Sequence, residues 1–87
     1  MNVRQTIGWH VRRLRVEKGL SQERLGLESG IDRSYVGRVE RGSENVTVST
    51  LEAFSQVLGV HVSELFSEVP DDMPAPDPLP SGRKPKT

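Results

Sequence analysis

Cysteine is absent from this 87-residue sequence, aromatic residues make up only 5%, and long apolar runs are lacking. The lack of cysteine excludes a disulfide framework, a thiolate metal site and a cysteine nucleophile. Because no run is apolar enough for a membrane span or for the core of an N-terminal signal peptide, we expect a soluble, cytoplasmic protein. The length leaves room for one small domain.

Motifs for catalysis and cofactor binding are also missing. His10 and His61 fall on separate predicted elements, and neither has a carboxylate at the spacing that a metal site requires. The sequence contains no GxSxG nucleophile motif and no glycine loop that could hold a phosphate group. We therefore predict a protein that is not an enzyme and that has no catalytic residue, no metal ion and no cofactor.

The net charge is zero, but basic and acidic residues are distributed unevenly. Residues 1–41 contain nine basic and five acidic residues, whereas residues 42–66 contain three glutamates and no lysine or arginine. The local field matters more than the total charge in attracting an anionic ligand. The first half of the chain is therefore the candidate for binding such a ligand, nucleic acid included.

Capping residues and the spacing of apolar residues predict five short helices. Ser21 and Asp32 are favourable N-cap residues, and Gly30 between them suits the left-handed conformation that often ends a helix. The predicted helices are Val3–Lys18, the segment between Ser21 and Gly30, Arg33–Arg41, Val48–Leu58 and Val62–Phe66. Residues 1–66 should therefore form a compact all-α domain, with a tight turn between the second and third helices.

The segment Arg33–Arg41 is amphipathic when it is placed on a helical wheel. One half carries Tyr35, Val36, Val39 and Glu40, and the other carries Arg33, Ser34, Gly37, Arg38 and Arg41. The first half should face the core, and the second should be exposed, polar and cationic. Gly26, on the preceding helix, should let these two helices cross closely because it has no side chain.

This pattern resembles the phage-repressor, Cro-like (XRE) family of helix-turn-helix proteins. The shared residues are Ser21-Gln22, Leu25-Gly26, Gly30-Ile31, Arg33-Ser34-Tyr35-Val36 and Glu40-Arg41-Gly42, followed by Leu58-Gly59-Val60 and Glu64-Leu65. The resemblance covers residues 7–66. It implies a five-helix, λ-repressor-like fold and a transcriptional regulator that binds double-stranded DNA as a homodimer on an inverted-repeat operator.

The resemblance also implies that the helix Arg33–Arg41 enters the major groove, where side chains reach base edges. The expected base contacts are Arg33, Ser34 and Arg38. An arginine fork fits guanine O6 and N7, and a serine hydroxyl bonds less selectively. The residues expected to contact the sugar-phosphate backbone of the DNA are Gln22, Tyr35, Gly37, Arg41, Ser43 and Asn45. The alternative for the arginines is a solvated basic face without base contacts.

Two further side chains, Arg15 and Glu40, are expected to form a structural salt bridge, as in the family that the sequence resembles. The alternative is that both are solvated surface charges. His10 has two interpretations, a phosphate contact or a half-exposed helix residue, and we favour the second. The last predicted helix leaves apolar residues near the end of the fold, and these suit a dimer contact: Leu65, Phe66 and Val69.

Residues 67–87 differ in composition from the rest of the chain. They contain all six prolines, with acidic residues between them, and end in a basic segment with Arg83, Lys84 and Lys86. Such a segment cannot bury enough apolar surface to offset the entropy lost on ordering, so we predict an extended or disordered tail. Its basic end either touches phosphate or only helps to keep the chain in solution. The tail also supports a second hypothesis, a protein-binding, antitoxin-like module in which the helix-turn-helix is mainly a scaffold or acts with a partner protein.

Overall fold

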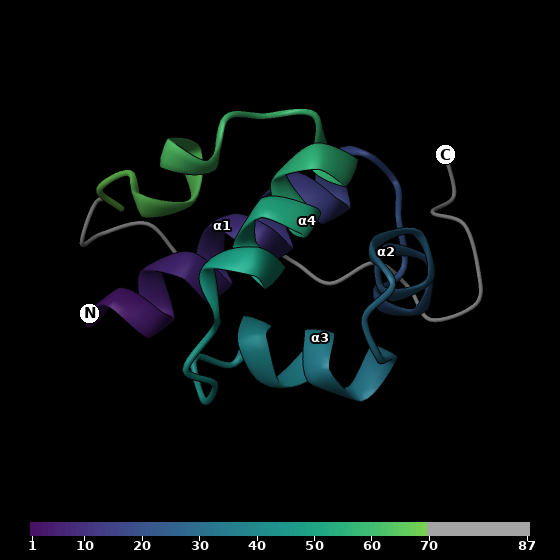
Figure 1. Cartoon of the computed structure of the whole chain (residues 1–87). Helices are drawn as coiled ribbons and strands as arrows, with labels where there is room; N and C mark the ends of the chain where they lie inside the picture. Colours follow the sequence, from purple (N-terminus) through teal and green to yellow (C-terminus); the bar gives the residue numbers. More distant parts are fainter. Residues whose placement is uncertain (70–87) are drawn as a thin grey trace, which may run out of the picture.

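A computed structural model describes residues 1–69, in which four α-helices are followed by one 3₁₀-helix (Figure 1). The elements are α1 (Val3–Glu17), α2 (Gln22–Ser29), α3 (Arg33–Glu40), α4 (Val48–Leu58) and η1 (Val62–Phe66). The all-α prediction is confirmed for this part of the chain. The prediction of five α-helices is wrong in its last element, because five residues close few α-type hydrogen bonds and short pieces often wind as 3₁₀-helix instead.

Each α-helix begins at a side chain that accepts a hydrogen bond from the first helical turn. Asn2 and Gln5 form a reciprocal capping box, with distances of 2.9 and 3.0 Å between side-chain oxygen and backbone nitrogen. Ser21, Asp32 and Thr47 cap the other three α-helices in the same manner. These contacts satisfy N–H groups that have no partner within the helix. The α-helix boundaries therefore agree with the predicted ones to within one residue.

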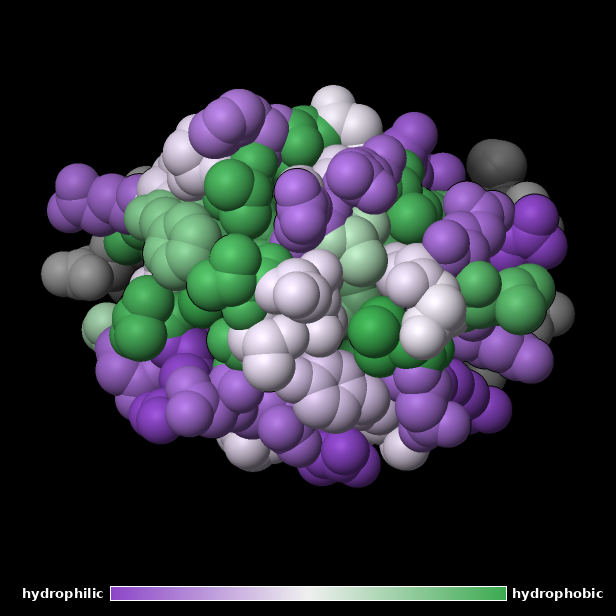
Figure 2. Space-filling view, viewed as in Figure 1, coloured by the Kyte–Doolittle hydropathy of each residue, from purple (hydrophilic) through white to green (hydrophobic). Residues whose placement is uncertain are grey.

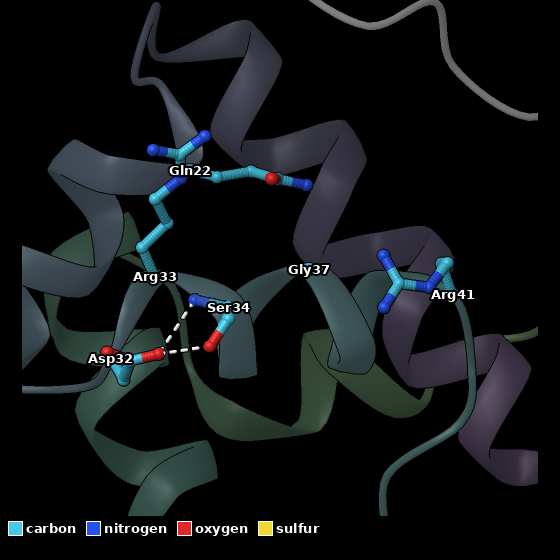
Figure 3. Close-up of a pocket in the computed structure, with 6 residues that line it drawn as sticks. All are labelled: Gln22, Asp32, Arg33, Ser34, Gly37 and Arg41. Carbon is cyan, nitrogen blue, oxygen red and sulfur yellow. Dashed lines mark hydrogen bonds between the residues drawn. The ribbon is translucent and has the colours of Figure 1, made fainter.

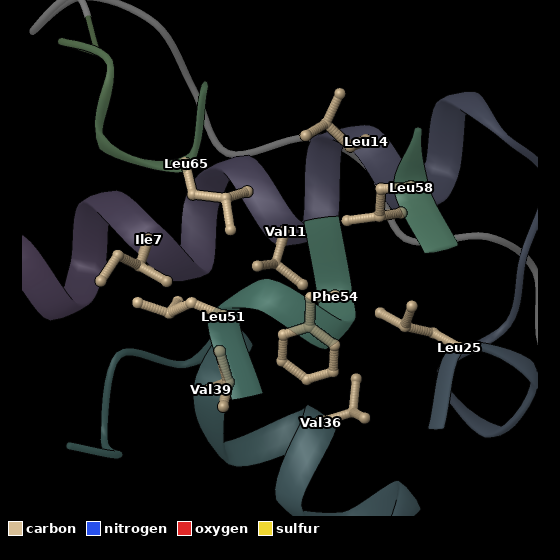
Figure 4. Packing of buried hydrophobic residues seen from close by; sticks show 10 residues of the cluster. All are labelled: Ile7, Val11, Leu14, Leu25, Val36, Val39, Leu51, Phe54, Leu58 and Leu65. Carbon is tan, nitrogen blue, oxygen red and sulfur yellow. The ribbon is translucent and has the colours of Figure 1, made fainter. Parts of the chain in front are cut away.

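α4 lies across α1, and α3 lies below both helices in the view of Figure 1; the core fills the space enclosed by these helices (Figures 1 and 4). Phe54 on α4 is fully buried, as are Val11 on α1 and Val36 on α3. Burial of a ring of this size contributes about 1.5–3 kcal/mol. The cluster consists of Ile7, Val11, Leu14, Leu25, Val36, Val39, Leu51, Phe54, Leu58 and Leu65. Because every element supplies at least one of these residues, the core fixes the position of α3 from its inner side.

Two glycines lie where one backbone approaches another closely. A Cβ atom at Gly8 would be 2.4 Å from the carbonyl oxygen of Val39 and 2.8 Å from that of Glu40. A Cβ atom at Gly26 would be 2.4 Å from the carbonyl oxygen of Ile31. The absence of a side chain therefore lets α1 lie against the end of α3. At Gly26 a Cβ atom would also lie 3.4 Å from Cα of Arg33, the first residue of α3, so α2 and the start of α3 approach closely, as predicted.

A buried ion pair connects α1 to α3. Arg15 donates from Nε and Nη2 to the two carboxylate oxygens of Glu40 at 2.6 and 2.9 Å, and each side chain is only 4% exposed. Arg15 Nη1 also donates to the carbonyl oxygen of Leu20 at 2.9 Å, and Gln22 Nε2 donates to Glu40 Oε1 at 3.1 Å. The salt bridge that the resemblance implied is therefore present, and it joins α1, the turn after it, α2 and α3.

His10 is buried against the segment that follows η1. Its Nε2 lies 2.8 Å from the carbonyl oxygen of Ser67, and its Nδ1 lies 3.1 Å from Nη2 of Arg13. Because an arginine can only donate, Nδ1 accepts and the Nε2–H group donates to Ser67. Both interpretations of His10 are therefore wrong: the ring is neither half-exposed nor available to a phosphate, because contacts within the fold occupy both nitrogens.

The packed part of the chain continues past the predicted boundary at residue 66. Leu65 is fully buried and Val69 is 7% exposed, whereas Phe66 is 48% exposed. Of the three residues in the predicted dimer contact, only Phe66 is therefore available to a partner. The prediction is wrong for the other two because they pack inside this chain.

Residues 70–87 lie outside the described residues, and with them all the prolines of the predicted tail and its basic end at Arg83, Lys84 and Lys86. The antitoxin-like hypothesis depends on this segment and stays a prediction. Within residues 1–69, no helix has both the length and the apolar character needed to cross a membrane.

The ion pair predicts a non-additive effect on stability. Arg15→Leu or Glu40→Leu alone should lower the free energy of unfolding by about 3–5 kcal/mol, because either change leaves a buried charge without its partner. The double variant should be more stable than either single variant. Urea denaturation measures all three, and additive losses in the double variant would contradict the buried pair. As a control, Arg24→Leu breaks the exposed pair with Glu28 and should cost less than about 1 kcal/mol.

Candidate nucleic-acid interface

The turn that joins α2 to α3 is fixed by local backbone and side-chain contacts. Gly30 ends α2 with φ at 73°, in the left-handed region that favours glycine. The N–H of Ile31 donates to the carbonyl oxygen of Gly26 at 2.8 Å, and the Ile31 side chain packs against the core. Asp32 then caps α3. The predicted order of helix, tight turn and helix is therefore confirmed.

α3 presents an apolar face to the core and a polar face to solvent. Val36 and Val39 are fully buried, whereas Arg33, Ser34 and Arg41 are exposed. In Figure 2, hydrophilic side chains gather along the lower edge of the molecule, where Figure 1 places α3. The predicted orientation of this helix is therefore confirmed, and its polar face lies at the edge of the fold.

A surface hollow lies between the start of α2 and the polar face of α3 (Figure 3). It is lined by Gln22, Asp32, Arg33, Ser34, Gly37 and Arg41. Figure 3 shows the side chains of Arg33 and Arg41 on opposite sides of Gly37. The hollow therefore brings together five of the predicted contact residues, with Asp32 as the one acidic residue in its lining.

Gln22 links this hollow to the buried ion pair. Its Nε2 group donates to Glu40, and its side chain lies beside Gly37. A Cβ atom at Gly37 would be 3.6 Å from Oε1 of Gln22 and 3.3 Å from Nη1 of Arg41. Gln22 therefore braces α3 from the side of α2, and Gly37 leaves room for the ends of two longer side chains.

Ser34 and Asp32 are already in contact with each other. The backbone N–H of Ser34 donates to the Asp32 carboxylate at 2.9 Å, and the Ser34 hydroxyl donates to the same oxygen. The hydroxyl and the N–H of Ser34, assisted by the charge of Arg38, lower the pKa of the Asp32 carboxyl below its usual value. Since the hydroxyl proton is engaged, Ser34 presents its oxygen to a base chiefly as a hydrogen-bond acceptor.

Arg38 lies outside the hollow and contacts a residue that the sequence analysis did not single out. Its Nε donates to Oε2 of Glu44 at 2.5 Å, and its guanidinium carbon lies 5.5 Å from the centroid of the Tyr35 ring. Glu44 is in the loop before α4, six positions after Arg38, and no helical spacing rule relates residues on different elements. Only the charge of Glu44 beside a basic helix could have suggested the contact from the sequence.

Ser43 and Asn45 follow α3 and are both exposed. The hydroxyl and the backbone N–H of Ser43 both donate to the carbonyl oxygen of Arg38 at 3.0 Å. Ser43 therefore closes the last turn of α3 within the protein. Its predicted contact with the DNA backbone stays a prediction.

Sequence and structure comparisons agree with this geometry. The chain matches the helix-turn-helix (HTH_3) family over residues 11–65. It is 43% identical over 67 residues to the uncharacterized HTH-type transcriptional regulator y4dJ of Sinorhizobium fredii, a match that covers 77% of this chain and 87% of that protein. It is 38% identical over 66 residues to the control protein C.BamHI of Bacillus amyloliquefaciens, covering 75% of this chain and 82% of the relative.

A solved structure is similar as well. The restriction-modification controller protein C.AhdI from Aeromonas hydrophila superposes with a TM-score of 0.70 and 46% sequence identity, covering 72% of this chain and 96% of that one. Fold and site thus define a helix-turn-helix protein of the transcription-regulator class. The chain belongs to the phage-repressor, Cro-like (XRE) helix-turn-helix family, as the resemblance implied.

The Asp32 cap predicts a pH-dependent contribution to stability. A carboxyl whose pKa is lowered by folding stabilises the fold above its unfolded pKa of about 3.9, and this stabilisation is lost as the pH falls through the lower folded pKa. Between about pH 5 and pH 2, wild type should lose more stability than Asp32→Asn, which keeps an oxygen acceptor but does not titrate. Urea unfolding at each pH measures the difference, and equal losses would contradict the assigned cap.

Proposed function

We propose that this protein is a transcriptional regulator that binds double-stranded DNA by placing α3 in the major groove. The observation that carries the proposal is the exposed polar face of α3, which the core and the buried ion pair hold at the edge of the fold. A major groove admits one α-helix and presents a distinct hydrogen-bonding pattern for each base pair. A regulator has to reach the DNA that it controls, so we also propose a cytoplasmic location.

In this proposal the two ends of α3 read separate base pairs. Arg33 and Arg38 are five residues apart, which corresponds to about 7.5 Å along a helix axis. That distance is about two base-pair steps of B-DNA. The two arginine forks therefore contact different base pairs, and Ser34 adds a less selective contact next to Arg33.

The remaining polar residues around α3 are proposed to contact the sugar-phosphate backbone. Gln22 and Arg41 line the hollow on either side of Gly37, and Ser43 and Asn45 are exposed in the loop after α3. The remaining proposed contact is the hydroxyl of Tyr35. Phosphate contacts of this kind fix the register of a helix in the groove and carry no sequence information themselves.

The proposed regulator binds as a homodimer on an inverted repeat. A single domain of this size offers a small contact surface, and a second copy would supply both affinity and a second half-site. Two recognition helices in successive major-groove faces are separated by about 34 Å. Selection of duplexes from a random pool by the purified full-length chain tests this directly, because enrichment of an inverted repeat reports both sequence preference and half-site spacing.

Two arginine variants separate base reading from phosphate binding. Arg38→Ala should lose about 1–3 kcal/mol of discrimination at one base pair of the enriched duplex. Arg41→Ala removes the same charge but should weaken binding to every sequence equally and reduce the slope of binding against salt by about one. Competition binding measures both variants. Unchanged sequence preference in Arg38→Ala would exclude this residue from base contact.

Gly37→Ala should separate stability from binding. A Cβ atom at Gly37 would meet only the flexible ends of Gln22 and Arg41, so the gain in helix propensity should stabilise the fold by about 0.5–1 kcal/mol. Binding to the enriched duplex should weaken, because the methyl group displaces the side chains of Gln22 and Arg41, which are proposed to contact the DNA backbone. Gly26→Ala is the control and should destabilise the fold, since its Cβ would collide with a backbone oxygen. A Gly37→Ala variant that binds as well as wild type would contradict the proposed role of the hollow.

A further inference from the structure

Arg38 is restrained on the polar face of α3 by two contacts within the fold. Its Nε donates to Glu44, and its guanidinium lies over the ring of Tyr35. The Arg38 side chain is 43% exposed and that of Glu44 is 23% exposed, so the pair lies at the surface without being fully solvated. Within residues 1–69, the terminal Nη1 and Nη2 groups of Arg38 make no hydrogen bond.

The buried arginine, Arg15, differs from Arg38 in the nitrogens that remain available. Arg15 uses Nε and Nη2 on Glu40 and Nη1 on a carbonyl oxygen, so all of its nitrogens are engaged inside the fold. Arg38 is bound at Nε only, which leaves the two groups that form a fork with guanine O6 and N7. The Glu44 contact therefore orients the side chain without occupying the atoms that read a base.

We propose that Glu44 is a positioning residue that sets sequence specificity by orienting the Arg38 fork toward a guanine. This inference rests on the proposed function, in which Arg38 contacts a base. An arginine that is already ordered loses less rotamer freedom on binding than a mobile one. Arg33 has no hydrogen bond or ion pair with the described residues. Because Arg33 is less restrained than Arg38, we expect stricter discrimination at the base pair that Arg38 contacts than at the one that Arg33 contacts.

The charge of Glu44 acts in the same direction. A phosphate oxygen that approaches Arg38 is repelled by the carboxylate and competes with it for the guanidinium. A guanine is neutral and uses Nη1 and Nη2, so it can bind while the Nε contact to Glu44 stays in place. Glu44 therefore weakens non-specific contacts to phosphate more than it weakens the specific contact to a base.

The test compares variants of the full-length chain on duplexes that wild type enriches from a random pool and on their single-base-pair variants. Arg38→Ala first identifies the base pair that Arg38 reads. At that pair, Glu44→Ala should lower discrimination by about threefold to tenfold, less than the loss of a whole bidentate contact. Binding to a random duplex should stay equal or become tighter. Glu44→Gln should retain most of the discrimination, because the amide oxygen still accepts from Nε.

Two controls separate positioning from charge and from folding. Glu28→Ala removes a carboxylate that pairs with Nε of Arg24 at 2.6 Å on α2, so it makes the same change in net charge away from α3 and should leave discrimination unchanged. In the Arg38→Ala background, Glu44→Ala should have no further effect on discrimination. Thermal melting of each variant reports whether the fold is intact.

The outcomes distinguish this inference from the proposed function. If Arg38→Ala loses its preference at one base pair and Glu44→Ala does not, positioning by Glu44 is overturned and base reading by Arg38 stands. If Glu44→Ala binds specific and random duplexes more tightly by the same factor, or weakens both equally with a lower melting temperature, Glu44 is only a competitor or a structural residue and the inference is also overturned. If Arg38→Ala keeps every preference, the proposed base contact itself fails.

Discussion

The buried ion pair between Arg15 and Glu40 is the interaction on which the position of α3 depends. Removing two charges from water costs several kcal/mol, and the cost is recovered only when both groups are fully hydrogen-bonded. Here the Leu20 carbonyl oxygen and the Gln22 amide supply the additional contacts. The pair therefore forms only when α1, the following turn, α2 and α3 are all in place, so it specifies one arrangement of the helix-turn-helix.

This electrostatic constraint requires a close approach of two backbones. α1 can bring Arg15 to Glu40 only because Gly8 has no Cβ atom, which would otherwise collide with the carbonyl oxygen of Val39 at 2.4 Å. On the other side, Val36 and Val39 anchor α3 in the core. The polar face of α3 is thus placed by contacts on its opposite face, and residues on the polar face can vary without moving the helix.

Local features of the fold could be predicted from the sequence, and contacts between distant segments could not. Helix boundaries follow from caps such as Ser21 and Asp32, whose partners lie within three residues. The burial of His10 depends on Ser67, 57 positions away, and a helical wheel cannot report that partner. The pair of Arg15 and Glu40 was expected only from the family resemblance. The contact of Glu44 with Arg38 was missed because the two residues lie on different elements, which no helical spacing relates.

The zero net charge of the chain is compatible with a basic site because several acidic side chains are engaged away from the hollow on α3. Glu40 is buried with Arg15, and Glu28 pairs with a neighbour along α2. Arg33 and Arg41 form no ion pair with any described residue, and both line the hollow on α3. Screening at physiological salt limits the influence of exposed charges to about 8 Å. An approaching phosphate therefore experiences these two arginines far more than the total charge, and composition alone underestimates the basic character of this surface.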